Sequence, residues 1–339
     1  MYQIQIADIT GIWGVSFLLY MLNAAVAQAV YLRRWKNPSV FVAIFLVWCD
    51  SLYGVLRLQT IHESQPAVRV AAIQDFSGAD ANGLAATTAD STPTVEKEDL
   101  IRDAGRRGAQ LIVGTEEAWG ATFRPGDPTD SVAALARETR SALVVGFSQS
   151  AVAGGKDWNC AGLVAPNGAT LGIHHKMRLF LGERQTVQAG DRAHAFDLPG
   201  LGKVGLLICF DSCYTNATRQ AVADGAQIIA MPNYDPPTVN AVLHELHAAL
   251  IPFRAVENRV AYVRADPNGL SQIVAPNGRI TAETGMYRAE ALVSTVALGD
   301  GRGTLFTRWG DWFAWGCVGL MLILTWRSPR KSISVPSPQ

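Results

Sequence analysis

Three side chains in the middle of the sequence are of the types that covalent catalysis needs: Glu116, Lys176 and Cys209. They follow short apolar runs, in the segments LIVGTEEA, GIHHKMRLFLGE and VGLLICFDS. Active sites of open α/β sheets form at and just beyond the ends of such strands. A thiolate is a strong nucleophile, a carboxylate can take the thiol proton, and a lysine can stabilise the oxyanion of a tetrahedral intermediate. Together the three types suit attack on a carbonyl carbon.

Each of the three residues also has a purely structural explanation. A cysteine that ends an apolar strand can be an inert core residue, a glutamate after a strand can cap the next helix, and a lysine in a loop can simply be solvated. Their spacing does not join them into one site. The sequence contains no Gly-x-Ser-x-Gly, no phosphate-binding loop and no His-Glu-x-x-His, which removes other common catalytic patterns.

The sequence gives no pattern for a metal site or a bound cofactor. Its five cysteines, at positions 49, 160, 209, 213 and 317, have no zinc-ligand spacing and are too few for a disulfide framework. His244 and His247 lie three residues apart on a predicted helix. With no third ligand near them in the sequence, we interpret them as packing or hydrogen-bonding residues. We expect neither a metal nor a cofactor.

The composition indicates a folded protein with no attraction to polyanions. Of the 339 residues, 49% are hydrophobic and 17% are charged, and 29 Lys and Arg balance 29 Asp and Glu. A chain this apolar and weakly charged can build a large core, which argues against disorder. A net charge of zero gives no reason to expect a nucleic-acid partner.

The residues between about 66 and 300 have the pattern of an α/β domain. Short β-rich runs lie at 68–74, 111–114, 142–146, 204–209, 227–231 and 260–264. Helical patterns lie at 96–107, 131–140, 215–224 and 239–258, the last with a kink expected at Pro252. Strands that alternate with helices indicate a sheet with parallel segments. Two Ala-Pro-Asn-Gly segments, 165–168 and 275–278, predict hairpin turns, whereas the small and polar residues 76–94 predict a loop.

Apolar runs at the two ends of the sequence predict transmembrane helices. Residues 9–32 contain no charge, and residues 40–56 contain one, Asp50, which should face protein or water. A third run, 309–326, contains only Asp311, and its tryptophans suit a membrane interface. The first run does not look like a cleavable signal peptide, because no Lys or Arg precedes it. We predict two spans within 1–60, a large domain at 66–300, a C-terminal span at 305–327 and a cytoplasmic tail at 328–339.

Cations beside the predicted spans set the expected orientation. Arg33, Arg34 and Lys36 lie between the first two spans, and three more cations lie at 327–331. Lys and Arg of short loops are retained on the cytoplasmic side, although cations on the other flanks weaken the contrast. The N-terminus and the large domain are therefore predicted to lie outside, with the short loop and the tail in the cytoplasm.

Five ordered motifs resemble the nitrilase, or carbon–nitrogen hydrolase, superfamily. VRVAAIQ resembles its opening strand, LIVGTE its glutamate motif, HHKMRLFLGE its lysine motif and GLLICFD its cysteine motif, while 253–280 resembles its later helix and hairpin. The resemblance implies a four-layer αββα sandwich, an α/β fold. It also implies that Glu116, Lys176 and Cys209 form a Glu-Lys-Cys triad.

The apolar flanks resemble one branch of that superfamily, the bacterial apolipoprotein N-acyltransferases. ADITGIWGVSFLLYMLNAAVA is similar to a late transmembrane helix of these enzymes, and TLFTRWGDWFAWGCVG to their closing helix. The resemblance thus runs from about residue 7 to residue 326. It implies transfer of an acyl chain from a phospholipid to the α-amine of a diacylglyceryl-modified N-terminal cysteine of a lipoprotein, on the outer face of a bacterial inner membrane.

The same resemblance implies a role for each site residue. Cys209 would attack the phospholipid ester to give a thioester, with Glu116 as general base and Lys176 as oxyanion stabiliser. Glu183 matches a supporting glutamate that would orient the lysine or share the acid–base work, unless it forms an ordinary surface ion pair. Asp211 stands where the family has a supporting glutamate. The implied partners are phospholipid, a lipoprotein cysteine and membrane lipid.

Departures from the family pattern leave other functions open. Thr115 stands in place of the usual proline, Phe210-Asp211 in place of Tyr-Glu, and the segment after the cysteine helix is Asn233-Tyr234-Asp235-Pro236. Family members carry more transmembrane helices before the point where this sequence begins. One alternative is a membrane-anchored amidase in which water resolves the acyl-enzyme. Another is an N-terminally incomplete or non-catalytic homologue, or a subunit whose partner supplies the missing helices.

Overall fold

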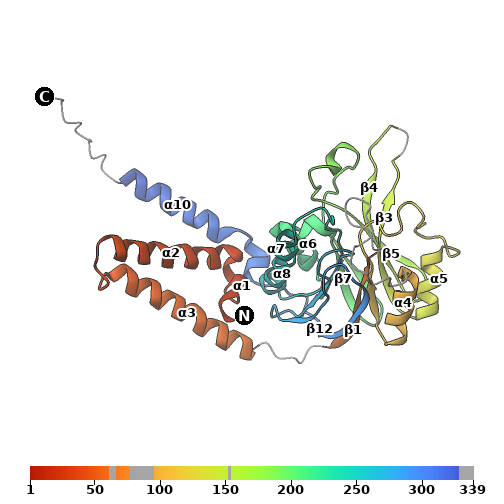
Figure 1. Ribbon diagram of the computed structural model, residues 1–339, viewed down its shortest axis with the longest axis horizontal. Helices are drawn as coiled ribbons and strands as arrows, with labels where there is room; N and C mark the ends of the chain where they lie inside the picture. Colours follow the sequence, from red (N-terminus) through yellow and green to blue (C-terminus); the bar gives the residue numbers. More distant parts are fainter. Residues whose placement is uncertain (61–65, 77–94, 152–153, 328–339) are drawn as a thin grey trace, which may run out of the picture.

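The computed structural model describes residues 1–60, 66–76, 95–151 and 154–327. The predictions of a loop at 76–94 and of a tail at 328–339 fall outside these residues, except for Phe76. In the described part, long apolar helices project from one side of a two-sheet sandwich (Figure 1).

Two six-stranded sheets form the centre of the sandwich. The first has the order β12-β1-β2-β3-β4-β5, with β1 Ala67–Asp75, β2 Leu111–Val113, β3 Ala142–Gln149, β4 Trp158–Val164, β5 Thr170–His175 and β12 Ala289–Ala297. The second has the order β11-β10-β9-β8-β7-β6, with β6 Ala195–Leu198, β7 Gly202–Leu206, β8 Ile228–Pro232, β9 Ala261–Ala265, β10 Gln272–Val274 and β11 Ile280–Glu283. β1, β2 and β3 run parallel, as do β7, β8 and β9, while the other neighbours are antiparallel. The predicted sheet with parallel segments is confirmed.

Alternating side chains along the strands build the layers of the sandwich. In β1, Val70 and Ala72 belong to the buried cluster between the two sheets, together with Leu206 of β7. Ala71 and Ile73 point the other way and belong to the cluster beneath the outer helices. Strands that are apolar on both faces are typical of sheets that are covered on both sides. The resulting order of helix, sheet, sheet and helix is the expected αββα sandwich.

Helices cover the outer face of each sheet. α4 (Lys97–Arg106) and α5 (Ser131–Thr139) pack on the first sheet, and α6 (Thr215–Ala223) and α8 (Leu250–Asn258) pack on the second. α5 begins where Asp130 caps it, because the Asp130 Oδ1 atom accepts a hydrogen bond from the N–H of Val132 at 2.8 Å. The helices predicted at 96–107, 131–140 and 215–224 are confirmed to within one residue at each end.

The single kinked helix predicted over 239–258 is wrong. The structure has two helices there, α7 (Ala241–Ala248) and α8, separated by the single residue Ala249. Pro252 is the third residue of α8. Proline lacks the N–H that a helix interior needs, but in the first turn that N–H would have no intrahelical partner. Starting a new helix at Leu250 therefore places the proline where its missing N–H costs no intrahelical hydrogen bond.

Two tight turns confirm the hairpins predicted from the Ala-Pro-Asn-Gly segments. β4 and β5 are joined across 165–169, and β10 and β11 across 275–279, with antiparallel pairing in both cases. The glycines of the two turns have φ angles of 85° at Gly168 and 83° at Gly278. Residues with a Cβ rarely adopt that conformation, so the glycine is what makes each turn possible.

Two N-terminal helices are long and apolar enough to cross a membrane. α2 (Ile12–Tyr31) has 20 residues and α3 (Pro38–Thr60) has 23, and the two lie side by side (Figure 1). The short helices η1 (Tyr2–Ile4) and α1 (Ala7–Thr10) precede them, and Gly11, with a φ of 66°, separates α1 from α2. The first predicted span is therefore two helices, of which only α2 has spanning length.

The C-terminal apolar helix is shorter in the described residues. α9 (Leu305–Trp309) leads into α10 (Trp312–Arg327), which has 16 residues. A bilayer core takes roughly 20 helical residues. The predicted C-terminal span therefore stays a prediction.

A largely buried ion-pair cluster joins the N-terminal helices to the sandwich. Asp8 of α1 accepts hydrogen bonds from Tyr53 at 2.7 Å, from Arg57 at 2.8 Å and from Arg259 at 2.7 Å. Arg259, directly after α8, also donates to Gln5 at 2.7 Å. Breaking a buried ion pair leaves an uncompensated charge, so this cluster fixes α1 and α3 against the end of α8.

Candidate active site

Cys209 lies in a turn after β7, and not at the end of a strand as the sequence predicts. The ladder of β7 ends at Leu206, and Cys209 opens the 3-10 helix η3 (Cys209–Cys213). Its φ angle is 43°, in the left-handed region that residues with a Cβ rarely occupy. The Sγ atom lies 3.7 Å from the carbonyl oxygen of Tyr234. The turn thus holds a buried thiol in a strained backbone conformation.

Glu116 lies in a loop after β2 that is pressed against β3. A Cβ at Gly146 of β3 would lie 2.6 Å from the backbone nitrogen of Glu117 and 2.7 Å from the Cα of Glu116. The N–H of Glu116 donates to the carbonyl oxygen of Asn233 at 3.2 Å, which ties the loop to the end of β8. The absence of a side chain at Gly146 is therefore a condition for the position of Glu116.

Lys176 follows β5 and lies between two carboxylates. Its Nζ atom donates to Oε1 of Glu116 at 2.7 Å and to Oε1 of Glu183 at 2.6 Å. Asn159 of β4 donates to the same two oxygens, at 2.7 Å and 3.2 Å. Glu183 opens the 3-10 helix η2 (Glu183–Gln185), and its Oε2 accepts a hydrogen bond from the N–H of Phe180 at 2.6 Å. Glu183 is thus in the position predicted for a residue that orients the lysine.

Burial and mutual charge shift the pKa values of all three predicted catalytic groups. Burial alone would lower the pKa of Lys176, but the charges on Glu116, Cys209 and Glu183 outweigh it and raise that pKa. Burial raises the pKa of Glu116, and Lys176 only partly opposes this. Burial, with the nearby Glu116 charge, raises the pKa of the Cys209 thiol well above its usual range. The lysine therefore stays cationic, and the thiol needs a base.

Asp211 is a structural residue of the cysteine turn. Its carboxylate is fully buried and accepts hydrogen bonds from the backbone N–H groups of Met177, Arg178 and Ile208 at 3.0, 2.8 and 3.1 Å, with His174 Nε2 at 2.9 Å. It therefore ties the turn that contains Cys209 to the loop that follows Lys176. Asp211 does not line the cavity that contains the triad, so a direct part in acid–base chemistry does not fit its position.

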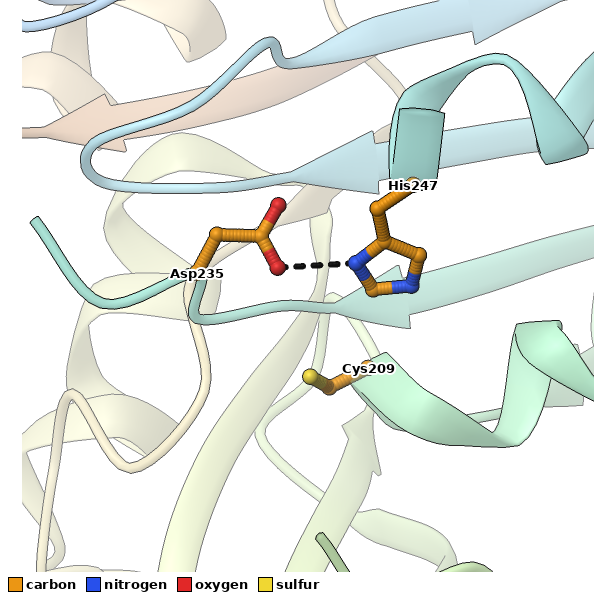
Figure 2. A group of neighbouring side chains, drawn as sticks. All are labelled: Cys209, Asp235 and His247. Atoms are coloured by element: carbon orange, nitrogen blue, oxygen red, sulfur yellow. Dashed lines mark hydrogen bonds and ion pairs between the residues drawn. The ribbon is translucent and has the colours of Figure 1, made fainter. Parts of the chain in front are cut away.

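His247 and Asp235 lie close to Cys209, with one polar or sulfur atom of each residue within 4.8 Å of those of the other two (Figure 2). The Nδ1 atom of His247 on α7 lies 2.8 Å from Oδ1 of Asp235, whose Oδ2 accepts a hydrogen bond from Arg264 at 2.5 Å. His244 lies 3.7 Å from the same carboxylate. Hydrogen bonding by His247 is as predicted, but the expectation of no third group beside the two histidines is wrong, because Asp235 lies between them.

Two groups of described residues bring metal-ligating atoms within 4.8 Å of one another. One consists of Cys209, Asp235 and His247, and the other of Asp235, His244 and Asp266. Asp235 belongs to both groups and is already paired with the guanidinium of Arg264. A fixed cation beside the shared ligand repels a metal ion. We interpret both groups as one network of ion pairs and hydrogen bonds.

A cavity of about 640 Å³ brings the three predicted catalytic residues together. Glu116, Lys176 and Cys209 all line it, as does the supporting Glu183. A second part of its lining is apolar and comes from α7 and its flanks: Val239, Leu243, Leu246 and Leu250. The cavity therefore joins a reactive polar end to a hydrocarbon wall.

Sequence reasoning missed three residues of the site. Asn159 is a lone polar residue in the apolar strand WNCAGLV, a position that could have indicated a buried hydrogen-bond donor. Asp235 and His247 are 12 positions apart, with a helix start between them, and no sequence spacing connects them to Cys209.

The sequence and fold have known relatives. Residues 69–304 match the family model for carbon-nitrogen hydrolase. An apolipoprotein N-acyltransferase of Geobacter metallireducens is 30% identical over an alignment of 359 positions. The alignment covers 97% of this chain and 68% of that protein. The omega-amidase NIT2 of Bos taurus is 30% identical over 216 residues, which cover 55% of this chain and 76% of that protein.

Solved structures share the sandwich. The crystal structure of Saccharomyces cerevisiae Nit3, described as a member of branch 10 of the nitrilase superfamily, matches with a TM-score of 0.56 at 22% identity, over 69% of this chain and 91% of that one. At this identity the match shows the fold alone. The chain spans about two thirds of the length of the curated relatives named apolipoprotein N-acyltransferase.

Proposed function

The chain belongs to the carbon–nitrogen hydrolase family, and on that premise we propose that it is a membrane N-acyltransferase that acylates the N-terminal amine of a diacylglyceryl-cysteine lipoprotein. The observation that carries the proposal is the cavity, which joins Glu116, Lys176 and Cys209 to an apolar wall, in a chain with two helices of membrane-spanning length. Two relatives named apolipoprotein N-acyltransferase, whose alignments each cover 97% of this chain, support the proposal.

In the first half-reaction, Cys209 attacks the ester carbonyl of a phospholipid. Glu116 takes the thiol proton as sulfur bonds to carbon, and the negative charge that develops on the carbonyl oxygen faces the Lys176 ammonium. All side-chain hydrogen bonds of Glu116 within the described residues use Oε1, which leaves Oε2 for the proton. Glu116 then returns the proton to the departing lysophospholipid oxygen, and a Cys209 thioester remains.

In the second half-reaction, an amine replaces the phospholipid. The amine nitrogen attacks the thioester carbon, Glu116 accepts the amine proton, and the proton returns to sulfur as the carbon–sulfur bond breaks. The cycle needs a permanent cation and a base of raised pKa, and Lys176 and Glu116 have those shifts. Glu183 and Asn159 would hold Lys176 in place through both steps.

The apolar wall of the cavity supports a lipid acyl donor. Leu243 and Leu246 of α7 are 53% and 58% exposed although they line the cavity. Burying exposed leucine surface against an acyl chain is favourable by about 25 cal/mol per Å² of apolar area. We propose that the chain is held in a bacterial inner membrane with the sandwich on its outer face, where phospholipid reaches the cavity.

Intact-protein mass spectrometry after incubation with phospholipid tests the proposal. We expect wild-type protein to gain an acyl mass that hydroxylamine removes, and Cys209→Ala to gain none. Cys213→Ala, four residues away, is the matched control and should retain the adduct. Absence of the adduct in folded wild-type protein with phospholipid present would contradict the proposed function.

An amidase is the second candidate, because the same triad can cleave a carbon–nitrogen bond when water resolves the acyl-enzyme. The match to an omega-amidase over the sandwich favours it. The two candidates differ in the acyl acceptor. Release of a free acid from an amide substrate, at the same rate with and without an amine acceptor, would favour the amidase, whereas an N-acylated product formed from phospholipid would favour the transferase.

A further inference from the structure

A series of hydrogen-bonded side chains connects the strained turn at Cys209 to Asp235. Ser212 Oγ donates to the carbonyl oxygen of Cys209 at 2.9 Å, and His247 Nε2 lies 2.9 Å from the same Oγ. On its other side His247 Nδ1 lies 2.8 Å from Oδ1 of Asp235. Figure 2 shows the carboxylate, the imidazole ring and the sulfur converging from three separate segments.

Counting donors and acceptors along this chain fixes the protonation of His247. A serine hydroxyl has one hydrogen, and the hydroxyl of Ser212 gives it to the carbonyl of Cys209. Nε2 of His247 must therefore donate to Ser212. An ionised aspartate only accepts hydrogen bonds, so Nδ1 must donate to Asp235. With a hydrogen on both nitrogens, His247 is an imidazolium cation.

The groups around His247 agree with a cation there. Asp235 and Asp266 bring negative charge from the ends of β8 and β9, and Arg264 brings a positive charge from β9. Cys209 and Cys213 approach from η3, and His244 lies one turn earlier on α7. Burial alone would lower the pKa of His247, but its hydrogen bond with Asp235 and the charge of that carboxylate, with a contribution from the neighbouring Cys213, outweigh it and raise the pKa to about 9.

We propose that His247 is a positioning residue for Cys209: as an imidazolium anchored on Asp235, it fixes Ser212 and thereby locks the turn that presents the thiol. The inference rests on the proposed function only in taking Cys209 as the nucleophile. Both N–H groups of His247 are already used, so the ring has no proton to give to a substrate. The stabilisation of the turn by charged His247 is fully present below pH 6.5, the ordinary pKa of histidine. It is lost as the pH rises through about 9 and His247 loses its proton.

Alkylation of Cys209 by iodoacetamide tests this without any lipid substrate. The rate at Cys209 is followed by peptide mass spectrometry for wild-type protein, His247→Gln and Ser212→Ala, between pH 6.5 and pH 10.5. We expect each variant to react about tenfold more slowly at pH 7, the effect of losing one charge-assisted hydrogen bond. The ratio of wild-type to His247→Gln rates should fall toward 1 above about pH 9, where His247 loses its charge.

His194→Gln is the matched control. His194 also pairs with an aspartate, at 3.1 Å from Asp224, but its side chain is 48% exposed and lies outside the cavity. It should change the rate less than twofold. Because Ser212 and His247 act through one chain, the double variant should react no more slowly than the slower single variant. Thermal unfolding of each variant confirms that the fold is retained.

Two results would overturn the proposal. One is a ratio within twofold of 1 at pH 7 for folded His247→Gln, and the other is a ratio that stays constant up to pH 10.5. Neither depends on acyl transfer. If phospholipid leaves no adduct on Cys209 while the alkylation ratio behaves as expected, the proposed function fails and the role of His247 stands.

Discussion

At the scale of single residues, one lysine holds two carboxylates in a fixed arrangement. Lys176 donates to Glu116 and Glu183 within 2.7 Å, and Asn159 donates to the same oxygens. Charge-assisted hydrogen bonds of this kind are short and strong. Rotating any one of these side chains would break at least one of these bonds, so the reactive groups are already in place before a substrate arrives.

Asp211 provides a test at this scale. We expect Asp211→Glu to lower the free energy of unfolding by about 1–3 kcal/mol, because an extra methylene must fit into a fully packed position. It should also slow thioester formation, since the carboxylate ties the turn that contains Cys209 to the loop that follows Lys176. Thermal unfolding and the mass-spectrometric assay measure the two effects.

Asp197→Glu is the control for that test, because the Asp197 side chain is 82% exposed. The same chemical change there should alter neither stability nor activity. If Asp211→Glu were as active and as stable as wild type, joining the turn to the loop would not be the role of Asp211, and an acid–base role would return to consideration.

The sequence predicts the three reactive residue types, but not their surroundings. Glu116, Lys176 and Cys209 could be identified because each stands in a motif beside an apolar strand. Asp235 and His247 could not, because Asp235 lies in a loop and His247 on a helix, and only the fold brings their side chains together. The left-handed conformation of Cys209 has no signal in residue type, since a positive φ at a non-glycine residue depends on its tertiary contacts.

At the scale of elements, β3 sets the position of the glutamate loop. The backbone of Glu116 and Glu117 passes so close to Gly146 that a Cβ on residue 146 would collide with it. We expect Gly146→Ala to displace Glu116 and to slow thioester formation by up to about 100-fold, the cost of a misplacement of about 1 Å in a catalytic group. The rate of adduct appearance in the mass-spectrometric assay measures this.

Gly182→Ala is the matched glycine change. A Cβ at Gly182 meets no atom within 4 Å, and its φ of −76° is open to any residue. It should retain wild-type rates. Equal rates for the two variants would mean that the Glu116 loop can shift without loss of function.

The elements with strong local signals are those that the sequence predicts well. The Ala-Pro-Asn-Gly turns and the apolar strands need only local information, so β4, β5, β10 and β11 follow from it. The break at Ala249 does not, because helical periodicity continues across it and Pro252 predicts a kink rather than two separate helices.

At the scale of the whole molecule, the buried cluster around Asp8 connects two parts with different surroundings. The N-terminal helices α2 and α3 expose many large apolar residues, among them Tyr20, Tyr31 and Phe45. The sandwich instead buries its apolar residues between layers. The contrast fits the proposed membrane location, and the division predicted near residues 60 and 305 stays a prediction.

The proposed orientation is tested with a cysteine-reactive probe that cannot cross membranes. In a background with Cys49, Cys213 and Cys317 replaced by serine, we expect Asp197→Cys, on the exposed edge strand β6, to be labelled in intact cells. Trp35→Cys, in the loop between α2 and α3 and 62% exposed, should be labelled only after the cells are opened. The reverse pattern would invert the orientation.

The pairing of the first and last strands of the sandwich has a consequence for biosynthesis. β1 pairs with β12 along its whole length, from Ala67 opposite Ala297 to Asp75 opposite Ala289. A ribosome that adds roughly 5–20 residues per second releases β1 about ten seconds or more before its neighbour exists. During that interval one edge of the nascent sheet is open, and open edges invite mispairing. The sheet can therefore be completed only after β12 has been translated, and a message truncated before codon 289 would yield a product in which that edge of β1 has no partner strand.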